Sequence, residues 1–129
     1  MSAANPTLEP MDELIGPFYD MDGLVEWLGR TKQAIGEQTR DGRLIGMQDA
    51  AGRWVYPTWQ FDGAGAVHPP LIEVWQLLRT EADPWTAAEW MCVRNPDTGG
   101  RIAADWLISG EDPEPVMCAA RDDVGRWSW

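Results

Sequence analysis

The 129-residue chain has few of the residues that bind metal ions or form cross-links. It contains one histidine, His68, and two cysteines, Cys92 and Cys118, which are too few for a disulfide scaffold or a structural zinc site. No apolar run approaches the roughly 18 residues that span a bilayer. No Lys or Arg precedes an apolar stretch at the N-terminus, as a secretory signal would require. We therefore expect a cytoplasmic protein with no metal, cofactor or membrane span.

Residues with catalytic potential are equally scarce. The single histidine precedes two prolines, which favours a structural role, and Cys92 lies in an apolar segment, where inert thiols are usual. The loop glycines Gly63 and Gly65 lack the following Lys and helix of a phosphate-binding loop. The sequence therefore predicts no catalytic residue and a protein that is not an enzyme.

Acidic residues are in excess, and the net charge of −11 argues against nucleic-acid binding, since phosphate affinity comes mainly from Lys and Arg. The basic residues are unevenly distributed, however. Residues 30–53 hold five bases against three acids, a net charge of +2, whereas six acids give −6 in residues 1–29 and twelve acids against five Arg give −7 in residues 54–129. This clustering is typical of a small DNA-reading element in an acidic protein, although chance grouping on a solvated face gives the same pattern.

The N-terminal half has the signals of two helices followed by a hairpin. Residues 21–28 predict a short helix, and Thr31 is a good N-cap for a second helix that ends near Arg40. Two apolar runs, 43–48 and 53–56, flank a glycine-containing turn and predict a β-hairpin. The residues expected to face inward are Leu24, Val25, Leu28, Ala34 and Ile35.

This order of elements is that of a winged helix-turn-helix, in which the second helix enters the major groove and the hairpin touches the DNA backbone. Gln33 and Arg40 can read base edges, and basic side chains suit phosphates. The predicted outer face of the second helix comprises Lys32, Gln33, Gly36, Glu37, Thr39 and Arg40. The predicted DNA-binding residues are Arg30, Thr31, Lys32, Gln33, Arg40, Arg43 and Arg53. The same pattern also fits a helix pair that serves packing only.

Residues 61–70 contain two glycines and two prolines and break the chain into two halves. Each half is small for independent stability, so we expect the halves to share a core or to be completed by a partner. The second half predicts four short helices, near residues 71–78, 85–93, 101–109 and 112–121, with a strong turn at 95–100.

The expected fold is therefore mainly α: a small winged helix-turn-helix with a β-hairpin, and a C-terminal four-helix bundle. The expected divisions are an acidic N-terminal segment (1–20), a DNA-binding domain (21–61), a linker (62–70), a helical domain (71–122) and a Trp-rich tail (123–129).

Nine tryptophans are more than so small a core can hide. Four of them fit interior positions: Trp27, Trp54, Trp75 and Trp106. Trp90, Trp127 and Trp129 have no obvious internal place. Exposed tryptophans commonly anchor interfaces, and the alternative is that the tail folds back over its own bundle.

Two parts of the chain resemble known modules. Residues 28–44, LGRTKQAIGEQTRDGRL, with residues 53–61, RWVYPTWQF, resemble the helix-turn-helix of excisionase and MerR proteins. Residues 83–91, DPWTAAEWM, then 95–101, NPDTGGR, and 104–110, ADWLISG, resemble the toxin-binding domain of the Xre/MbcA/ParS antitoxins. Together the two resemblances cover roughly residues 20–121.

The resemblance implies a type II antitoxin that represses its own operon through operator DNA and neutralises a cognate toxin, usually of the RES type, which consumes NAD. It implies that the partner surface includes the turn with Asn95, Gly99, Gly100 and Arg101. We expect Trp127 and Trp129 to belong to this surface as well, because they have no obvious internal place. Since operators are usually read by dimers, we expect a homodimer or a hetero-oligomer. Two alternatives are a DNA-independent interaction adaptor and a phage-encoded transcriptional regulator without a toxin partner.

Overall fold

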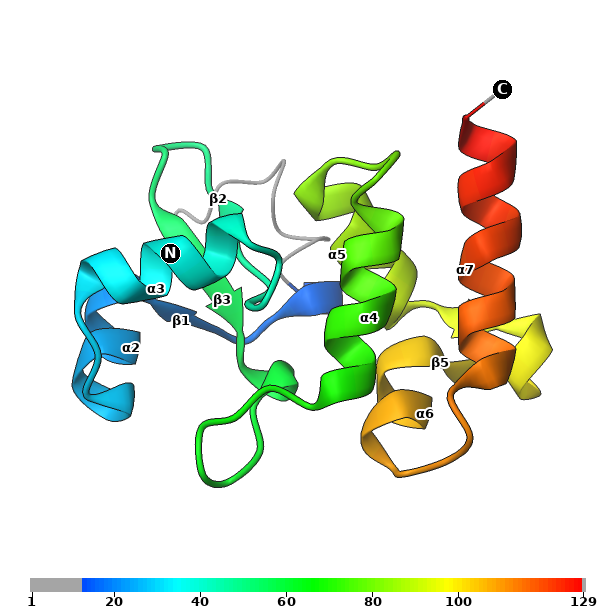
Figure 1. Ribbon diagram of the computed structural model, residues 1–129, viewed down its shortest axis with the longest axis horizontal. Coiled ribbons are helices and arrows are strands. Elements are labelled where there is room, and N and C mark those ends of the chain that lie inside the picture. Colours follow the sequence, from blue (N-terminus) through cyan, green and yellow to red (C-terminus); the bar gives the residue numbers. More distant parts are fainter. Residues whose placement is uncertain (1–12, 129) are drawn as a thin grey trace.

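A computed structural model describes residues 13–128 of the chain, and Figure 1 shows their arrangement. They form a mainly helical structure with small antiparallel sheets. The expectations for residues 1–12 of the acidic segment and for Trp129 lie outside the described residues. No helix within residues 13–128 combines the length and apolarity needed to cross a bilayer.

The first half contains two helices, α2 (Met21–Leu28) and α3 (Lys32–Arg40), with the bounds that the sequence predicts. Thr31 is the predicted N-cap of α3: its Oγ1 accepts a hydrogen bond from the Ala34 amide at 3.1 Å. Leu24 and Ile35 are fully buried and pack with Leu44 and Tyr56 in a small apolar cluster. The inner faces of both helices are therefore as predicted.

A three-stranded sheet lies against this helix pair, with strand order β1-β3-β2. The predicted hairpin is β2 (Met47–Gln48) and β3 (Trp54–Pro57). The third strand, β1 (Phe18–Asp20), corrects the assignment of residues 1–20 to a separate acidic segment, because these three residues pair along β3. A strand of three residues is too short to carry a period-two pattern, so no local pattern predicts it.

The second half contains α4 (Pro69–Leu78), α5 (Pro84–Cys92), α6 (Ala103–Ile108) and α7 (Glu114–Trp127), with short 3-10 turns at Thr58–Gln60 and Pro96–Thr98. Four helices were predicted, but two have different limits.

Residues Arg101–Ile102 form β5, which pairs with β4 (Arg94–Asn95), so the third of these helices begins at Ala103 and not at Arg101. The last helix runs to Trp127, and most of the predicted tail is therefore the end of α7.

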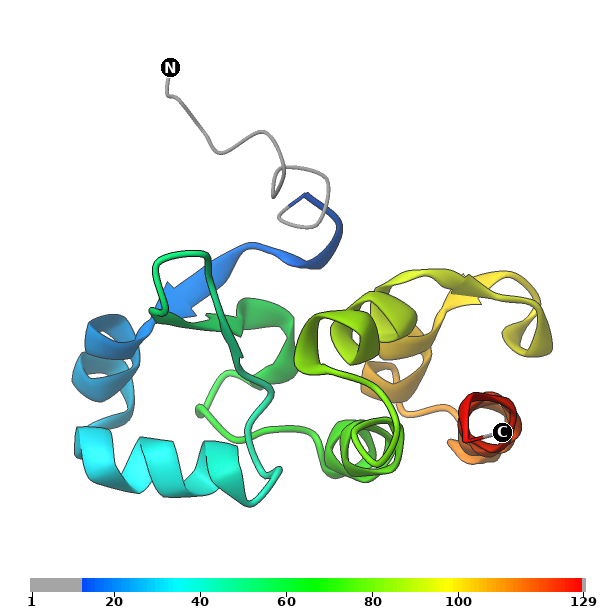
Figure 2. The same ribbon diagram turned by 90° about the horizontal axis from the view of Figure 1, so that it is seen from above.

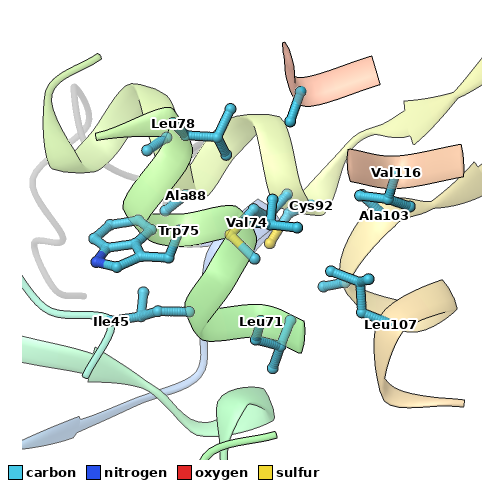
Figure 3. Close-up of a cluster of buried hydrophobic side chains, with 14 of the residues drawn as sticks. Ile45, Leu71, Val74, Trp75, Leu78, Ala88, Cys92, Ala103, Leu107 and Val116 are labelled. Carbon is cyan, nitrogen blue, oxygen red and sulfur yellow. The ribbon is translucent and has the colours of Figure 1, made fainter. Parts of the chain in front are cut away.

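One large apolar core joins the two halves (Figure 3). Ile45, from the N-terminal half, packs in the same cluster as Leu71, Val74 and Leu78 of α4. Helices α5, α6 and α7 add further buried residues to this cluster, among them Ala88, Ala103, Leu107 and Val116. We expected the halves either to share a core or to be completed by a partner, and the structure shows that they share a core. In Figure 2, α3 (cyan), α4 (green) and α7 (red) lie along one side of the molecule.

The tryptophans depart from the prediction at two positions. Trp27 is 42% exposed and Trp54 is 36% exposed, although both were expected inside. Each stacks on a tyrosine of the sheet, Trp27 on Tyr19 and Trp54 on Tyr56, so that the ring covers the cluster from outside. Trp75 is buried, as predicted.

Candidate nucleic-acid interface

The outer face of α3 is open to solvent. Gln33, Gly36 and Arg40 lie three or four residues apart and therefore share one side of the helix, opposite the buried Ile35. Gln33 and Arg40 are exposed, and a Cβ added at Gly36 would meet no atom within 4 Å. Glu37 is also exposed on this side, so the face presents Gln33, Arg40 and one carboxylate beside the open position of Gly36.

Thr39 does not belong to this face, contrary to the sequence prediction. Its Oγ1 donates to the Ile35 carbonyl at 2.8 Å and lies 3.3 Å from the Tyr56 Oη, and both contacts point inward. Burial raises the pKa of Tyr56, and the hydrogen bond with Thr39 offsets part of that rise. Thr39 thus fixes α3 to β3 through its hydroxyl and is not part of the outer face.

Three of the predicted basic contacts are already paired with carboxylates. Lys32 Nζ lies 3.7 Å from Asp22, Arg43 lies 3.2 Å from Asp41, and Arg53 lies 3.2 Å from Asp49. All three bases are largely exposed, and exposed ion pairs contribute only about 0–1 kcal/mol. A phosphate can therefore replace these carboxylates at small cost.

Arg30 and Arg40 differ from those three bases. Arg30 donates to the Gln38 Oε1 at 2.9 Å. Among residues 13–128, neither arginine has a carboxylate within ion-pair distance. Arg40 is thus an uncompensated cation at the C-terminal end of the exposed face.

The hairpin loop is held by Asp49. Its Oδ1 accepts hydrogen bonds from the amides of Ala51 and Arg53, both at 2.9 Å, and these bonds lower the pKa of Asp49. Trp54, which follows the loop, lines one hollow with Gly36 and Arg40 and another with Asp20–Asp22 at the start of α2. Trp54 of the hairpin therefore lies next to α3, because it lines one hollow with Gly36 and Arg40.

Sequence reasoning missed two residues at this surface. Trp54 was assigned to the interior, and Arg79, at the C-terminal end of α4, was not considered although it lines the same hollow as Arg40. No local signal identifies Arg79, because its position beside α3 depends on how α4 packs against the first half.

The predicted partner turn forms the β4–β5 hairpin. Asn95 is only 8% exposed, and its Oδ1 accepts from the Asp97 amide at 2.8 Å, so its side chain closes the turn. Gly99 and Gly100 have φ of 67° and 84°, which other residues rarely adopt. Arg101 pairs with Glu111 at 3.4 Å and lies over the Trp106 ring. Four predicted partner residues are thus engaged in building the turn.

This turn lies beside the last helix. A groove between them is lined by Asn95, Pro96, Asp97, Ala119, Asp122, Asp123 and Arg126. Trp90, for which no internal place was predicted, donates from Nε1 to Asp123 at 2.6 Å and is half-buried. Trp127 is 38% exposed at the end of α7. The structure therefore brings the predicted turn and the predicted tail to one end of the molecule.

The described part of the chain offers little for other chemistry. It contains no group of three His, Cys, Asp or Glu side chains placed to hold a metal ion. Cys92 is buried, and burial raises the pKa of its thiol to about 12, so the reactive thiolate is suppressed at neutral pH.

Comparison with known proteins identifies a similar fold but no protein family. No model of a known protein family matches the chain, and no curated protein matches it. The fold is similar to that of the NMR structure of Rv2175c, with a TM-score of 0.62 and 20% sequence identity. The match covers 98% of this chain and 86% of that one. At this identity the similarity concerns the fold alone.

Proposed function

We propose that this protein binds double-stranded DNA, with α3 in the major groove and the β2–β3 hairpin against the backbone, as in a winged helix-turn-helix. One observation carries the proposal: α3 is anchored on its inner side by Ile35 and Thr39, while Gln33 and Arg40 point outward beside an exposed hairpin. A helix fixed in this way presents base-reading side chains in a constant geometry.

The residues take different roles in this proposal. Gln33 suits the paired donor and acceptor of adenine, and Arg40 suits the two acceptors of guanine. Arg30, Lys32, Arg43 and Arg53 suit phosphates on either side of the helix. Thr31 contributes by capping α3, because its hydroxyl already accepts the Ala34 amide.

The acidic character of the chain bears on specificity. Non-specific binding depends on the number of phosphates neutralised by Lys and Arg, and the chain has ten such residues against 21 acids. We therefore expect weak binding to arbitrary DNA and a large share of the affinity from base contacts. Because operators are usually read by dimers, we also propose a dimer on the DNA.

Selection of duplexes from a random library tests the proposal. The wild-type protein should enrich a common motif, and affinity for that motif should fall by about 1–3 kcal/mol in Gln33→Ala and in Arg40→Ala. Arg94→Ala removes an exposed arginine of β4 and serves as the control, which should bind as the wild type does. Failure to retain any duplex at low salt would contradict the proposal.

A second candidate function is neutralisation of a toxin, which the resemblance to the Xre/MbcA/ParS antitoxins implies. One observation favours it: the turn of residues 95–101 and the end of α7 border one groove, with Trp127 exposed nearby. The partner would be a RES-type toxin, and the NAD-consuming chemistry would belong to that partner.

Co-expression with the protein encoded by the adjacent reading frame tests this second function. Growth arrest by the neighbour alone, relieved by this chain, would support an antitoxin. DNA binding without such relief would favour a transcriptional regulator that has no toxin, and partner binding without DNA binding would favour an adaptor.

A further inference from the structure

A hollow of about 370 Å³ lies between the ends of α3 and α4, beside the face proposed to enter the major groove. Gly36 and Arg40 of α3 form one side of it, Trp75 and Arg79 of α4 form the other, and Trp54 of β3 also lines it. Among residues 13–128, two guanidinium groups and no carboxylate line this hollow. Its chemistry is therefore that of a site for an anion.

Close packing fixes α4 against the end of α3. Gln76 Nε2 donates to the carbonyls of Asp41 and Gly42, at 3.3 and 3.4 Å. A Cβ on Gly42 would lie 2.9 Å from the Gln76 Cγ, so the two segments touch at this point. Arg79 follows Gln76 by three residues and shares its side of α4. The contact thus places Arg79 beside the end of α3.

The charge on both arginines is available to a ligand. Arg79 is exposed and donates to the Ala82 carbonyl at 2.7 Å, and within residues 13–128 no carboxylate lies at ion-pair distance from Arg79 or Arg40. The carboxylates on neighbouring turns are differently engaged: Asp41 pairs with Arg43, and Asp83 caps α5 through the Thr86 amide. Glu37 lies exposed on α3 and does not line the hollow.

The dimensions of DNA indicate which anion this hollow would meet. The major groove is about 12 Å wide and a helix with its side chains is about 10–12 Å across, so an inserted helix fills the groove. Groups directly beside that helix then meet the phosphates at the edge of the groove. The hollow borders α3 on the side of α4, and the C-terminal end of α4 reaches the same side of the molecule as α3 (Figure 1).

We propose that Arg79, next to the base-reading Arg40, holds one backbone phosphate of the bound duplex, with the Trp54 ring against the adjoining sugar. This inference rests on the proposed DNA binding and extends it, because it assigns a DNA contact to the second half of the chain. It also gives the shared core a function, since the core sets the position of α4 relative to α3.

The test compares Arg79→Gln with Arg94→Gln. Arg94 is a matched control: it is exposed, donates to the Gly100 carbonyl at 3.1 Å and, among the described residues, has no carboxylate at ion-pair distance. Glutamine keeps an N–H donor at both positions, and thermal melting of both variants verifies that the fold is intact.

Affinity for a 20-base-pair duplex is measured by fluorescence anisotropy between 50 and 200 mM salt. Loss of one phosphate contact should reduce the slope of log affinity against log salt by about 0.9, which corresponds to a loss on the order of tenfold near 0.1 M salt. Arg79→Gln should show both effects, and Arg94→Gln should show neither.

Methylphosphonate groups, introduced one at a time into the duplex, then locate the phosphate. At one position, the modified duplex should bind the wild type more weakly than the unmodified duplex does. Arg79→Gln should bind both duplexes with the same affinity. Equal affinities of Arg79→Gln and Arg94→Gln would overturn the inference, and the proposed DNA binding would stand if Gln33→Ala and Arg40→Ala still weakened it. Absence of duplex binding by the wild type would overturn both.

Discussion

The hydroxyl of Thr39 and the phenol of Tyr56, 3.3 Å apart, join α3 to the central strand of the sheet. Thr39 is half-buried and Tyr56 is fully buried, so the contact is shielded from water. This pair adds to the packing of Ile35 in holding α3, which carries Gln33 and Arg40, against the sheet.

Thr39→Val should reduce the free energy of unfolding by about 1–3 kcal/mol, because it leaves the buried Tyr56 hydroxyl without its partner. Affinity for DNA, measured at a temperature at which the variant is folded, should remain within a few fold of the wild type. Thr80→Val is the control, since Thr80 is exposed and donates only to its own helix end. A variant with full stability and no DNA binding would instead put Thr39 on the binding face.

Stability should fall as the pH rises above about 9. Burial raises the pKa of the Cys92 thiol from 9.0 to about 12 in the folded protein, so unfolding releases a proton between these values. The native state holds the proton, and each pH unit in this window costs up to about 1.4 kcal/mol of unfolding free energy. Denaturant titrations at a series of pH values should therefore show that the unfolding free energy falls less steeply with pH in Cys92→Ala than in the wild type. Cys118→Ala, at an exposed cysteine, should keep the wild-type slope.

Gln60 ties the end of the first half to the backbone at Ile45, a residue of the shared core. Its buried amide accepts from the Ile45 N–H and donates to the Ile45 carbonyl, both at 2.8 Å. Gln60→Leu leaves both backbone groups unpaired and should cost on the order of 2–5 kcal/mol in a denaturant melt. Gln76→Leu removes two long hydrogen bonds of an exposed glutamine and should cost less than about 1 kcal/mol. Equal losses would show that Gln60 has no special part in holding the backbone of Ile45 in the core.

Removing residues 126–129 should leave the fold nearly intact, although this segment includes the last turn of α7. Trp127 is 38% exposed, and the Trp90–Asp123 hydrogen bond, which lies before the deletion, holds the helix to its neighbour. A change in unfolding free energy below about 1 kcal/mol is expected. If the chain neutralises a toxin, the same truncation should release toxicity in cells that carry the partner. Unfolding of the truncated chain would place the terminal tryptophans in the core, whereas full neutralisation would exclude them from the interface.

Local signals explain which parts of the fold the sequence predicted well. Thr31 and Asp83 cap α3 and α5 through their own side chains, and the stripe from Leu71 to Leu78 is buried, so these features needed only neighbouring residues. Helix α7 was cut short because Asp122, Asp123 and Gly125 are typical of a helix end. The contact of Asp123 with Trp90 and the packing of Val124 on the core keep that segment helical.

The candidate site was predicted only in part for the same reason. The exposed face of α3 follows from helical periodicity and from the bases around it. The inward turn of Thr39 depends on Tyr56, seventeen residues away, and the approach of Arg79 depends on Gln76 touching Gly42 across the molecule. No pattern within a window of the sequence encodes either contact.

The claim that the outer face of α3 binds DNA is tested most directly by the duplex affinity of Gly36→Glu beside that of Gly125→Glu. Both glycines lie within helices, and a Cβ at either would meet no atom within 4 Å, so both changes should preserve the fold and raise helix stability by about 0.5–1 kcal/mol. Gly36→Glu adds a second carboxylate, beside that of Glu37, to the face that carries Gln33 and Arg40, whereas Gly125→Glu adds none there. The account predicts that Gly36→Glu loses at least about tenfold in affinity at low salt while Gly125→Glu binds within about twofold of the wild type. Equal affinities of the two variants would contradict it.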